Sequence, residues 1–263
     1  MPDFSAKDVQ ALRRETGAGM LDAKRALEEA KGDVEKAKLW LREQGLASSG
    51  KRSGRASSQG AVSVVVDGPG AIVELRCETD FVAKSPEFVN LVDELAHLVA
   101  SKGEDAMADR QADVEELNVT LKENIGVGQV VRFVPAEGAI LDSYLHVQND
   151  RGVNAVLVEM EGGTNDLAHE VAVHIAFARP AYLSRDEVPA SEVEAERATL
   201  ESISRKEGKP EAALPKIVEG RLTGWFKERC LLDQPYARDE KQTIAQLIGE
   251  ARVTRFAQVV VGV

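Results

Sequence analysis

Side chains that act as nucleophiles or metal ligands are few in this 263-residue sequence. Cys77 and Cys230 lie too far apart along the chain to form a Cys-x-x-Cys metal or redox pair. A thiol hydrolase would combine one of them with an acid and with one of the histidines, which are His97, His146, His169 and His174. No spacing supports that combination, so both cysteines are interpreted as reduced packing residues in a reducing compartment.

Other catalytic signatures are also missing from the sequence. It contains no Gly-rich phosphate loop, no nucleophile elbow and no Cys or His pair with metal-ligand spacing. The run from Gly17 to Gly19 reads Gly-Ala-Gly and lacks the further glycine and the preceding strand of a dinucleotide fingerprint. His174 falls between Val171 and Ala178 on an apolar helical stripe, which favours a hydrogen-bonded core histidine. We therefore expect no catalytic residue, no metal and no cofactor.

One short segment, Thr79–Lys84, places an acid and an aromatic residue where a strand-like run gives way to a helix. The preceding run from Ala71 to Cys77 is typical of a buried strand, and Ser85 followed by proline is typical of a helix start. Phe81 is therefore expected on a short turn. There it could be a binding residue presented by rigid neighbours, or a hydrophobic staple that packs on the following helix. The local pattern by itself favours the staple.

Composition and charge restrict the class of protein. The chain has 43% hydrophobic residues, which is enough for ordinary cores, and it lacks an apolar run long enough to cross a bilayer. The first residues also lack the order of a signal peptide, so a cytoplasmic protein is expected. The net charge of −11 disfavours direct nucleic-acid binding. The charge is uneven, because residues 1–60 carry 12 Lys and Arg against 9 Asp and Glu while the remainder carries 21 against 35.

Helical periodicity and glycine stops predict a three-helix module over residues 1–46, with the second helix beginning at Met20 or Leu21. Residues 47–60 contain serine, glycine and three basic residues without a large apolar side chain, which predicts a flexible linker. Such a linker would allow the module to be positioned independently. That arrangement is more common in binding proteins than in enzymes with closed active sites.

The rest of the chain predicts a core with two similar halves, residues 61–138 and 139–263. Each half begins with a hairpin of β-branched residues followed by a helix, although residue identity between the halves is weak. Within the second half, residues 191–226 predict two antiparallel helices with a thin apolar seam, which would protrude as an arm. A helix over residues 240–251 and a final strand at 259–261 complete the prediction. The fold class is therefore α+β with antiparallel sheets.

Several segments resemble the bacterial elongation factor Ts family, the nucleotide-exchange factors for elongation factor Tu. The resemblance covers nearly the full length, and it is carried by Leu12–Met20, Asp22–Leu27, Thr79–Lys84, His174–Ala176, Gly208–Pro210 and Ile217–Arg221. The first three runs are the specific ones and the others are supportive. The resemblance implies a ubiquitin-associated-like (UBA-like) amino-terminal module, a core of two α+β halves and a helical-hairpin arm.

The resemblance also implies a mechanism and a set of site residues. Asp80 and Phe81 would enter the nucleotide-binding domain of elongation factor Tu as a wedge, with Phe81 next to the Mg²⁺ site, so that GDP loses its metal. The flanking residues of the turn are Thr79, Val82, Ala83 and Lys84; Val82 is expected to pack within the chain and Lys84 to hold the turn. The residues that match partner-binding surfaces are Leu12, Met20, Leu21 and His146. The alternative function is a tethered adaptor or chaperone-like scaffold without exchange activity.

Overall fold

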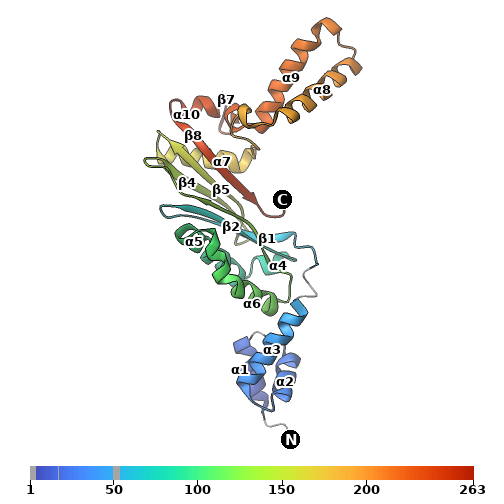
Figure 1. Ribbon diagram of the computed structural model, residues 1–263, viewed down its shortest axis with the longest axis vertical. Helices are drawn as coiled ribbons and strands as arrows, with labels where there is room; N and C mark the ends of the chain where they lie inside the picture. Colours follow the sequence, from blue (N-terminus) through green and yellow to red (C-terminus); the bar gives the residue numbers. More distant parts are fainter. Residues whose placement is uncertain (1–3, 17, 50–53) are drawn as a thin grey trace.

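Two three-stranded antiparallel sheets stack face to face at the centre of the molecule (Figure 1). The computed structural model describes residues 4–16, 18–49 and 54–263, so Gly17 and residues 50–53 of the predicted linker lie outside the described residues. The first sheet consists of β1 (Gln59–Val66), β2 (Gly70–Cys77) and β3 (Gly126–Phe133). The second consists of β4 (Ile140–Gln148), β5 (Arg151–Glu161) and β8 (Arg252–Val260). The strand orders, β1-β2-β3 and β4-β5-β8, both place the second strand of a hairpin at the centre.

The alternation of side chains along the central strands explains this stacking, because successive residues of a strand face opposite sides of a sheet. On β2, Ile72 packs between the sheets, whereas Val73 and Leu75 belong to the cluster on the outer face. From the second sheet, Ala155 and Leu157 complete the layer between the sheets. Both faces of the central strands are therefore covered.

One helix covers the outer face of each sheet. Helix α5 (Pro86–Lys102) packs on β1 and β2, and α7 (Asn165–Ala178) packs on β4 and β5. The hydroxyls of Ser85 and Thr164 cap these helices by accepting a hydrogen bond from the backbone N–H three residues further on. The helix start predicted at Ser85 is confirmed. The resulting order of layers, helix, sheet, sheet and helix, confirms the α+β class with antiparallel sheets.

A further helix, α6 (Gln111–Leu121), follows the 3₁₀ helix η1 (Glu104–Arg110) and leads towards β3. The sequence predicts a helix over residues 113–124, and α6 ends three residues earlier, at Leu121. The reason is local, since Lys122 has φ +59° in the left-handed region and turns the chain out of the helix.

The amino-terminal module contains α1 (Ala6–Thr16), α2 (Met20–Glu29) and α3 (Val34–Ser49) and lies at one end of the elongated molecule (Figure 1). Its small core is formed by Val9, Leu12, Ala23, Ala26, Leu27 and Ala37. Helix α3 also packs on α6 of the first half. The module is therefore in contact with the core, whereas the sequence predicted independent positioning.

The predicted linker begins within helix α3 and ends just before strand β1. Residues 47–49 continue α3, and β1 begins at Gln59. Between these elements, the Ser57 hydroxyl donates to the backbone carbonyl of Asn124 (2.8 Å), and the Asn124 side-chain amide donates to the carbonyl of Arg55 (2.8 Å). The first residues of this segment are therefore helical and the last ones are hydrogen-bonded to Asn124, while the flexibility of residues 47–60 stays a prediction.

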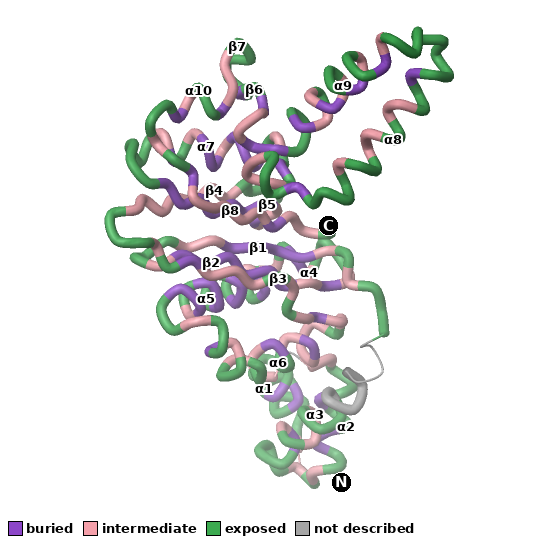
Figure 2. Tube along the Cα trace, turned by 45° about the horizontal axis from the view of Figure 1, so that its top comes forward, coloured by how far each residue is buried: buried purple, intermediate pink, exposed green. Residues whose placement is uncertain are grey.

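At the other end of the molecule, α8 (Ala190–Lys206) and α9 (Leu214–Arg229) pack on each other and extend away from the sheets (Figure 1). The buried side of α9 contains Leu214, Val218, Leu222 and Phe226, while most of both helices is exposed or half-buried (Figure 2). Ion pairs such as Arg197 with Glu219 join the two helices. Among the helices that the structure describes, none has the length and apolar character needed to cross a membrane.

The carboxy-terminal prediction needs one correction. Residues 240–251 do not form a single helix, because β6 (Pro235–Tyr236) pairs with β7 (Asp239–Thr243) and only Ile244–Ile248 is helical, as α10. A capping box at Thr243 starts this short helix, and Gly249, with φ +57°, follows its end. The last strand, β8, is longer than the predicted residues 259–261.

Candidate functional site

The segment Thr79–Lys84 forms a single helical turn, α4 (Asp80–Ala83), at the end of β2. Thr79 is its N-cap, and its hydroxyl accepts a hydrogen bond from the backbone N–H of Val82 (3.4 Å). Ala83 is buried, and Val82 packs against the cluster between the first sheet and α5. The apolar side of the turn therefore anchors it on the core, and its other residues face outwards.

Phe81 is the outward-facing aromatic residue of this turn, with 73% of its surface exposed. A hydrophobic staple would be covered by the helix that follows, so the packing of this chain does not support the staple interpretation. The only ring contact described for Phe81 comes from the Lys84 ammonium, 4.6 Å from the ring centroid. Phe81 is thus an exposed apolar side chain held on an ordered turn.

Asp80 lies beside Phe81 and is also exposed. Its carboxylate is 3.7 Å from the Lys84 ammonium, with both side chains about half in solvent. A pair with this exposure contributes about 0–1 kcal/mol to folding. Asp80 is therefore available to an external partner at little cost, and Lys84 borders both the acid and the aromatic ring.

The turn is held by a second segment that the sequence analysis did not identify. The Glu123 carboxylate accepts hydrogen bonds from the backbone N–H groups of Glu78 (2.9 Å) and Thr79 (3.0 Å) and from the Thr79 hydroxyl. In return, the Glu78 carboxylate accepts from the backbone N–H of Asn124 (2.8 Å). No local pattern signals this contact, because the two segments are more than 40 residues apart in the sequence.

The hairpin turn between β4 and β5 lies at the same end of the sheets as α4. Arg151, the first residue of β5, donates to the side-chain oxygen of Gln59 (3.1 Å), and Gln59 pairs with Cys77 at the end of β2. His146 is exposed near the end of β4, close to this turn. The structure therefore brings His146 and Phe81 to the same end of the stacked sheets, although they belong to different halves.

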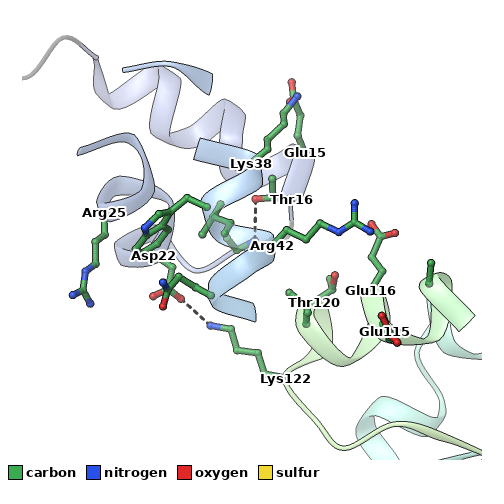
Figure 3. A pocket seen from close by; sticks show the side chains of 16 residues that line it. Glu15, Thr16, Asp22, Arg25, Lys38, Arg42, Glu115, Glu116, Thr120 and Lys122 are labelled. Carbon is green, nitrogen blue, oxygen red and sulfur yellow. Dashed lines mark hydrogen bonds and ion pairs between the residues drawn. The ribbon is translucent and has the colours of Figure 1, made fainter. Parts of the chain in front are cut away.

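The amino-terminal module approaches the same region through an ion pair. The Lys122 ammonium is 2.9 Å from the Asp22 carboxylate (Figure 3), and Lys122 directly precedes Glu123. At the start of α2, Met20 is 45% exposed and Leu21 is 81% exposed. The helix that begins with these two apolar side chains is thus joined to the Thr79–Lys84 turn through one short segment of the core.

The structure places Leu12, one of the predicted contact residues, inside the module and not on its surface. It is fully buried in the core of the three-helix module, and its carbonyl accepts a hydrogen bond from the Thr16 hydroxyl (2.6 Å). Its helical spacing with Val9 directs it inwards.

Between the module and α6 lies an open cleft of about 700 Å³, bordered by charged side chains that include Asp22 and Lys122 (Figure 3).

Both cysteines and one of the four histidines are packed inside. Cys77 and Cys230 are fully buried, and burial raises the pKa of the first thiol to about 12 and of the second to about 11. A buried thiol that resists ionisation is a poor nucleophile. His174 is buried as predicted; it shares a hydrogen bond with Gln234 (3.0 Å) and accepts one from the Ala237 N–H (3.3 Å), while burial lowers its pKa.

Comparison with known proteins identifies the family. The family model described as "Elongation factor TS" matches residues 78–263. An elongation factor Ts of Renibacterium salmoninarum is 44% identical over 281 aligned residues, covering 100% of both chains. Those of Streptomyces coelicolor (44%, 100% of both chains) and Paenarthrobacter aurescens (42%, 97% of this chain and 99% of the relative) are similar. The chain belongs to the elongation factor Ts family.

The family match includes the Thr79–Lys84 turn and the segment that supports it. Thr79–Lys84 and Glu123 both lie within the residues that the elongation factor Ts model covers. Met20 and Leu21 precede that range and are covered by the full-length relatives. The resemblance found in the sequence is therefore confirmed at the level of the family, and the roles of individual residues follow as proposals.

Proposed function

We propose that this chain binds elongation factor Tu, in its GDP-bound and nucleotide-free states, and promotes the release of GDP. Membership of the elongation factor Ts family supports this role. The observation that best supports the proposed site is the exposure of Phe81, an aromatic side chain that is 73% exposed on an ordered turn. Exposed aromatic residues on rigid supports are typical anchors of protein interfaces. The reaction is an exchange of bound nucleotide without covalent chemistry, in the cytoplasm where translation takes place.

In the proposed mechanism, Asp80 and Phe81 form a wedge that enters the nucleotide-binding domain of the partner next to its Mg²⁺ site. Phe81 supplies apolar surface that becomes buried on binding, and Asp80 supplies a negative charge close to it. The wedge favours a conformation of the partner that holds Mg²⁺ and GDP poorly. Because the two ligands favour different states of one protein, each weakens the binding of the other by the same factor, with a typical coupling of about 1–3 kcal/mol.

Further surfaces contribute to the proposed complex. Met20 and Leu21, on a module that we propose to be UBA-like, contact the same domain of the partner, and their exposure supports this role. His146 contacts the third domain of the partner and lies at the same end of the sheets as the wedge. The arm formed by α8 and α9 is a helical hairpin available for additional contacts. With a net charge of −11, direct contact with nucleic acid or a membrane surface is not part of the proposal.

The proposal is tested by mixing the purified chain with elongation factor Tu loaded with fluorescent GDP and recording nucleotide release by stopped flow. We expect the observed rate to rise with the concentration of the chain and to reach a plateau. A complex that forms without accelerated release would instead support the adaptor or scaffold function. Adding excess Mg²⁺ should slow the release, because the wedge and the metal favour different states.

A further inference from the structure

We propose that Glu123 is a positioning residue for the wedge, so that exchange depends on a side chain outside the Thr79–Lys84 segment. This inference rests on the proposed function and extends it. It starts from the geometry of α4, which is a single helical turn. One isolated turn is unstable in water, because the cost of fixing its backbone exceeds the gain of its few hydrogen bonds. The orientation of Phe81 must therefore come from tertiary contacts.

The Glu123 carboxylate supplies the main polar contact of this kind. Its Oε2 accepts from the N–H groups of Glu78 (2.9 Å) and Thr79 (3.0 Å), and its Oε1 accepts from the Thr79 hydroxyl. Two of these donors are backbone groups at the end of β2, directly before α4. Hydrogen bonds to an ionised carboxylate are stronger than those between neutral groups. One side chain thus fixes the direction in which the chain leaves the sheet.

The Thr79 hydroxyl connects this contact to the helical turn itself. A hydroxyl has one hydrogen to donate and lone pairs with which to accept. At Thr79 the hydrogen is directed to Glu123, so a lone pair can accept the N–H of Val82 and cap α4. If Glu123 did not take the hydrogen, the hydroxyl could rotate and the cap would weaken. Glu123 therefore acts on the position of Phe81 through Thr79.

The supporting segment is itself held in place. The backbone N–H of Asn124 donates to the Glu78 carboxylate (2.8 Å), so residues 78–79 and 123–124 hold each other reciprocally. Lys122, with φ +59°, turns the chain towards Thr79 after α6. Its ammonium pairs with Asp22 of the amino-terminal module (2.9 Å). The same segment therefore joins the wedge to the module that carries Met20 and Leu21.

The test compares Glu123→Gln and Glu123→Ala with the wild-type chain. Glutamine keeps the shape but has one acceptor oxygen in place of two, so it cannot accept all three hydrogen bonds. Glu137→Gln is the matched control, since Glu137 is exposed in the turn after β3, at the opposite end of the sheets from Cys77. The maximal rate of fluorescent GDP release from elongation factor Tu is measured at saturating exchange factor. In parallel, 4-fluorophenylalanine incorporated at position 81 reports the environment of the ring by ¹⁹F NMR.

We expect Glu123→Ala to lower the maximal release rate roughly tenfold, Glu123→Gln to lower it less, and Glu137→Gln to leave it unchanged. The ¹⁹F signal should move towards that of an unfolded chain in both Glu123 variants while the far-ultraviolet circular dichroism stays native. Unchanged rates and unchanged ¹⁹F signals in the Glu123 variants would overturn the proposal.

Two Thr79 variants test the same contact from its other side, and Phe81→Ala separates this inference from the proposed function. Thr79→Ser keeps the hydroxyl and should retain exchange, whereas Thr79→Val removes it, and its effect should add little to that of Glu123→Gln because both act through one contact. If Phe81→Ala slows release and the Glu123 variants do not, the wedge stands and the positioning role is wrong. If elongation factor Tu releases GDP at the wild-type rate in the presence of Phe81→Ala, the proposed function of the wedge is wrong.

Discussion

Replacing Phe81 by alanine should impair exchange while affecting folding only slightly. About three quarters of the residue is in solvent, so only roughly a quarter is covered on folding. For an aromatic side chain of about 200 Å², this is about 50 Å² of apolar area, or ~1 kcal/mol at ~25 cal/mol per Å². The exposed contact with the Lys84 ammonium adds about 0.5–1 kcal/mol. The free energy of unfolding should therefore fall by about 1.5–2 kcal/mol.

The effect on the partner should be larger than the effect on folding. A buried aromatic anchor at an interface commonly contributes about 2 kcal/mol or more, which corresponds to a loss of affinity of about thirtyfold. We expect Phe81→Ala to require a higher concentration for half-maximal GDP release and to give a lower plateau. Stopped-flow release of fluorescent GDP over a series of exchange-factor concentrations measures both quantities. Urea unfolding measures the cost to the fold.

Val134→Ala is the matched control for the Phe81→Ala prediction. Val134→Ala also shortens an exposed apolar side chain, but Val134 follows β3 at the opposite end of the sheets, and its release curve should equal that of the wild type. The reasoning would be refuted if Phe81→Ala gave a wild-type release curve together with a loss of several kcal/mol in unfolding free energy. That result would mean that the ring stabilises the fold of this chain rather than the complex.

The other predictions concern Asp80, the amino-terminal module and a buried histidine. Asp80→Asn should slow GDP release with an unchanged melting temperature, because its exposed pair with lysine contributes little to folding; a wild-type release rate would remove it from the site. Leu21→Ala should weaken the complex in a calorimetric titration without destabilising the chain, whereas Leu12→Ala should cost about 2–5 kcal/mol of module stability, because only Leu12 is buried. Burial lowers the pKa of His174 in the folded chain, so the imidazole of the unfolded chain binds a proton first as the pH falls below about 6.5. The free energy of unfolding should therefore fall by up to ~1.4 kcal/mol per pH unit until the pH reaches the pKa of the folded chain. Urea unfolding at pH 7.5, 6.5 and 5.5 should show a smaller dependence on pH in His174→Gln.

Local patterns predicted most of the central elements because their causes are local. The hairpin of β1 and β2, the start of α5 after Ser85 and the buried stripe of α7 follow from side-chain alternation, capping and helical periodicity. The error at residues 240–251 has a physical reason. The helix-favouring residues at 239–243 are drawn into a two-stranded ladder, and a threonine cap delays the helix until Ile244.

Burial was harder to predict than secondary structure in the amino-terminal module. Leu12, Met20 and Leu21 are all apolar and all lie in runs that resemble the family. Packing separates them, because Leu12 faces the core formed by three helices whereas Leu21 is 81% exposed at the start of α2. Sequence resemblance marks a segment, but it does not say which side of a helix meets a partner.

By itself, the sequence determined the α+β class, the family and the segment Thr79–Lys84, since each depends on residue types at short spacing. The tertiary structure decided whether Phe81 packs on its own chain, and it shows the ring exposed. It also revealed Glu123 as the support of the turn. Two segments more than 40 residues apart meet through hydrogen bonds to backbone groups, which any residue type can donate except proline, so the sequence carries no local sign of the contact.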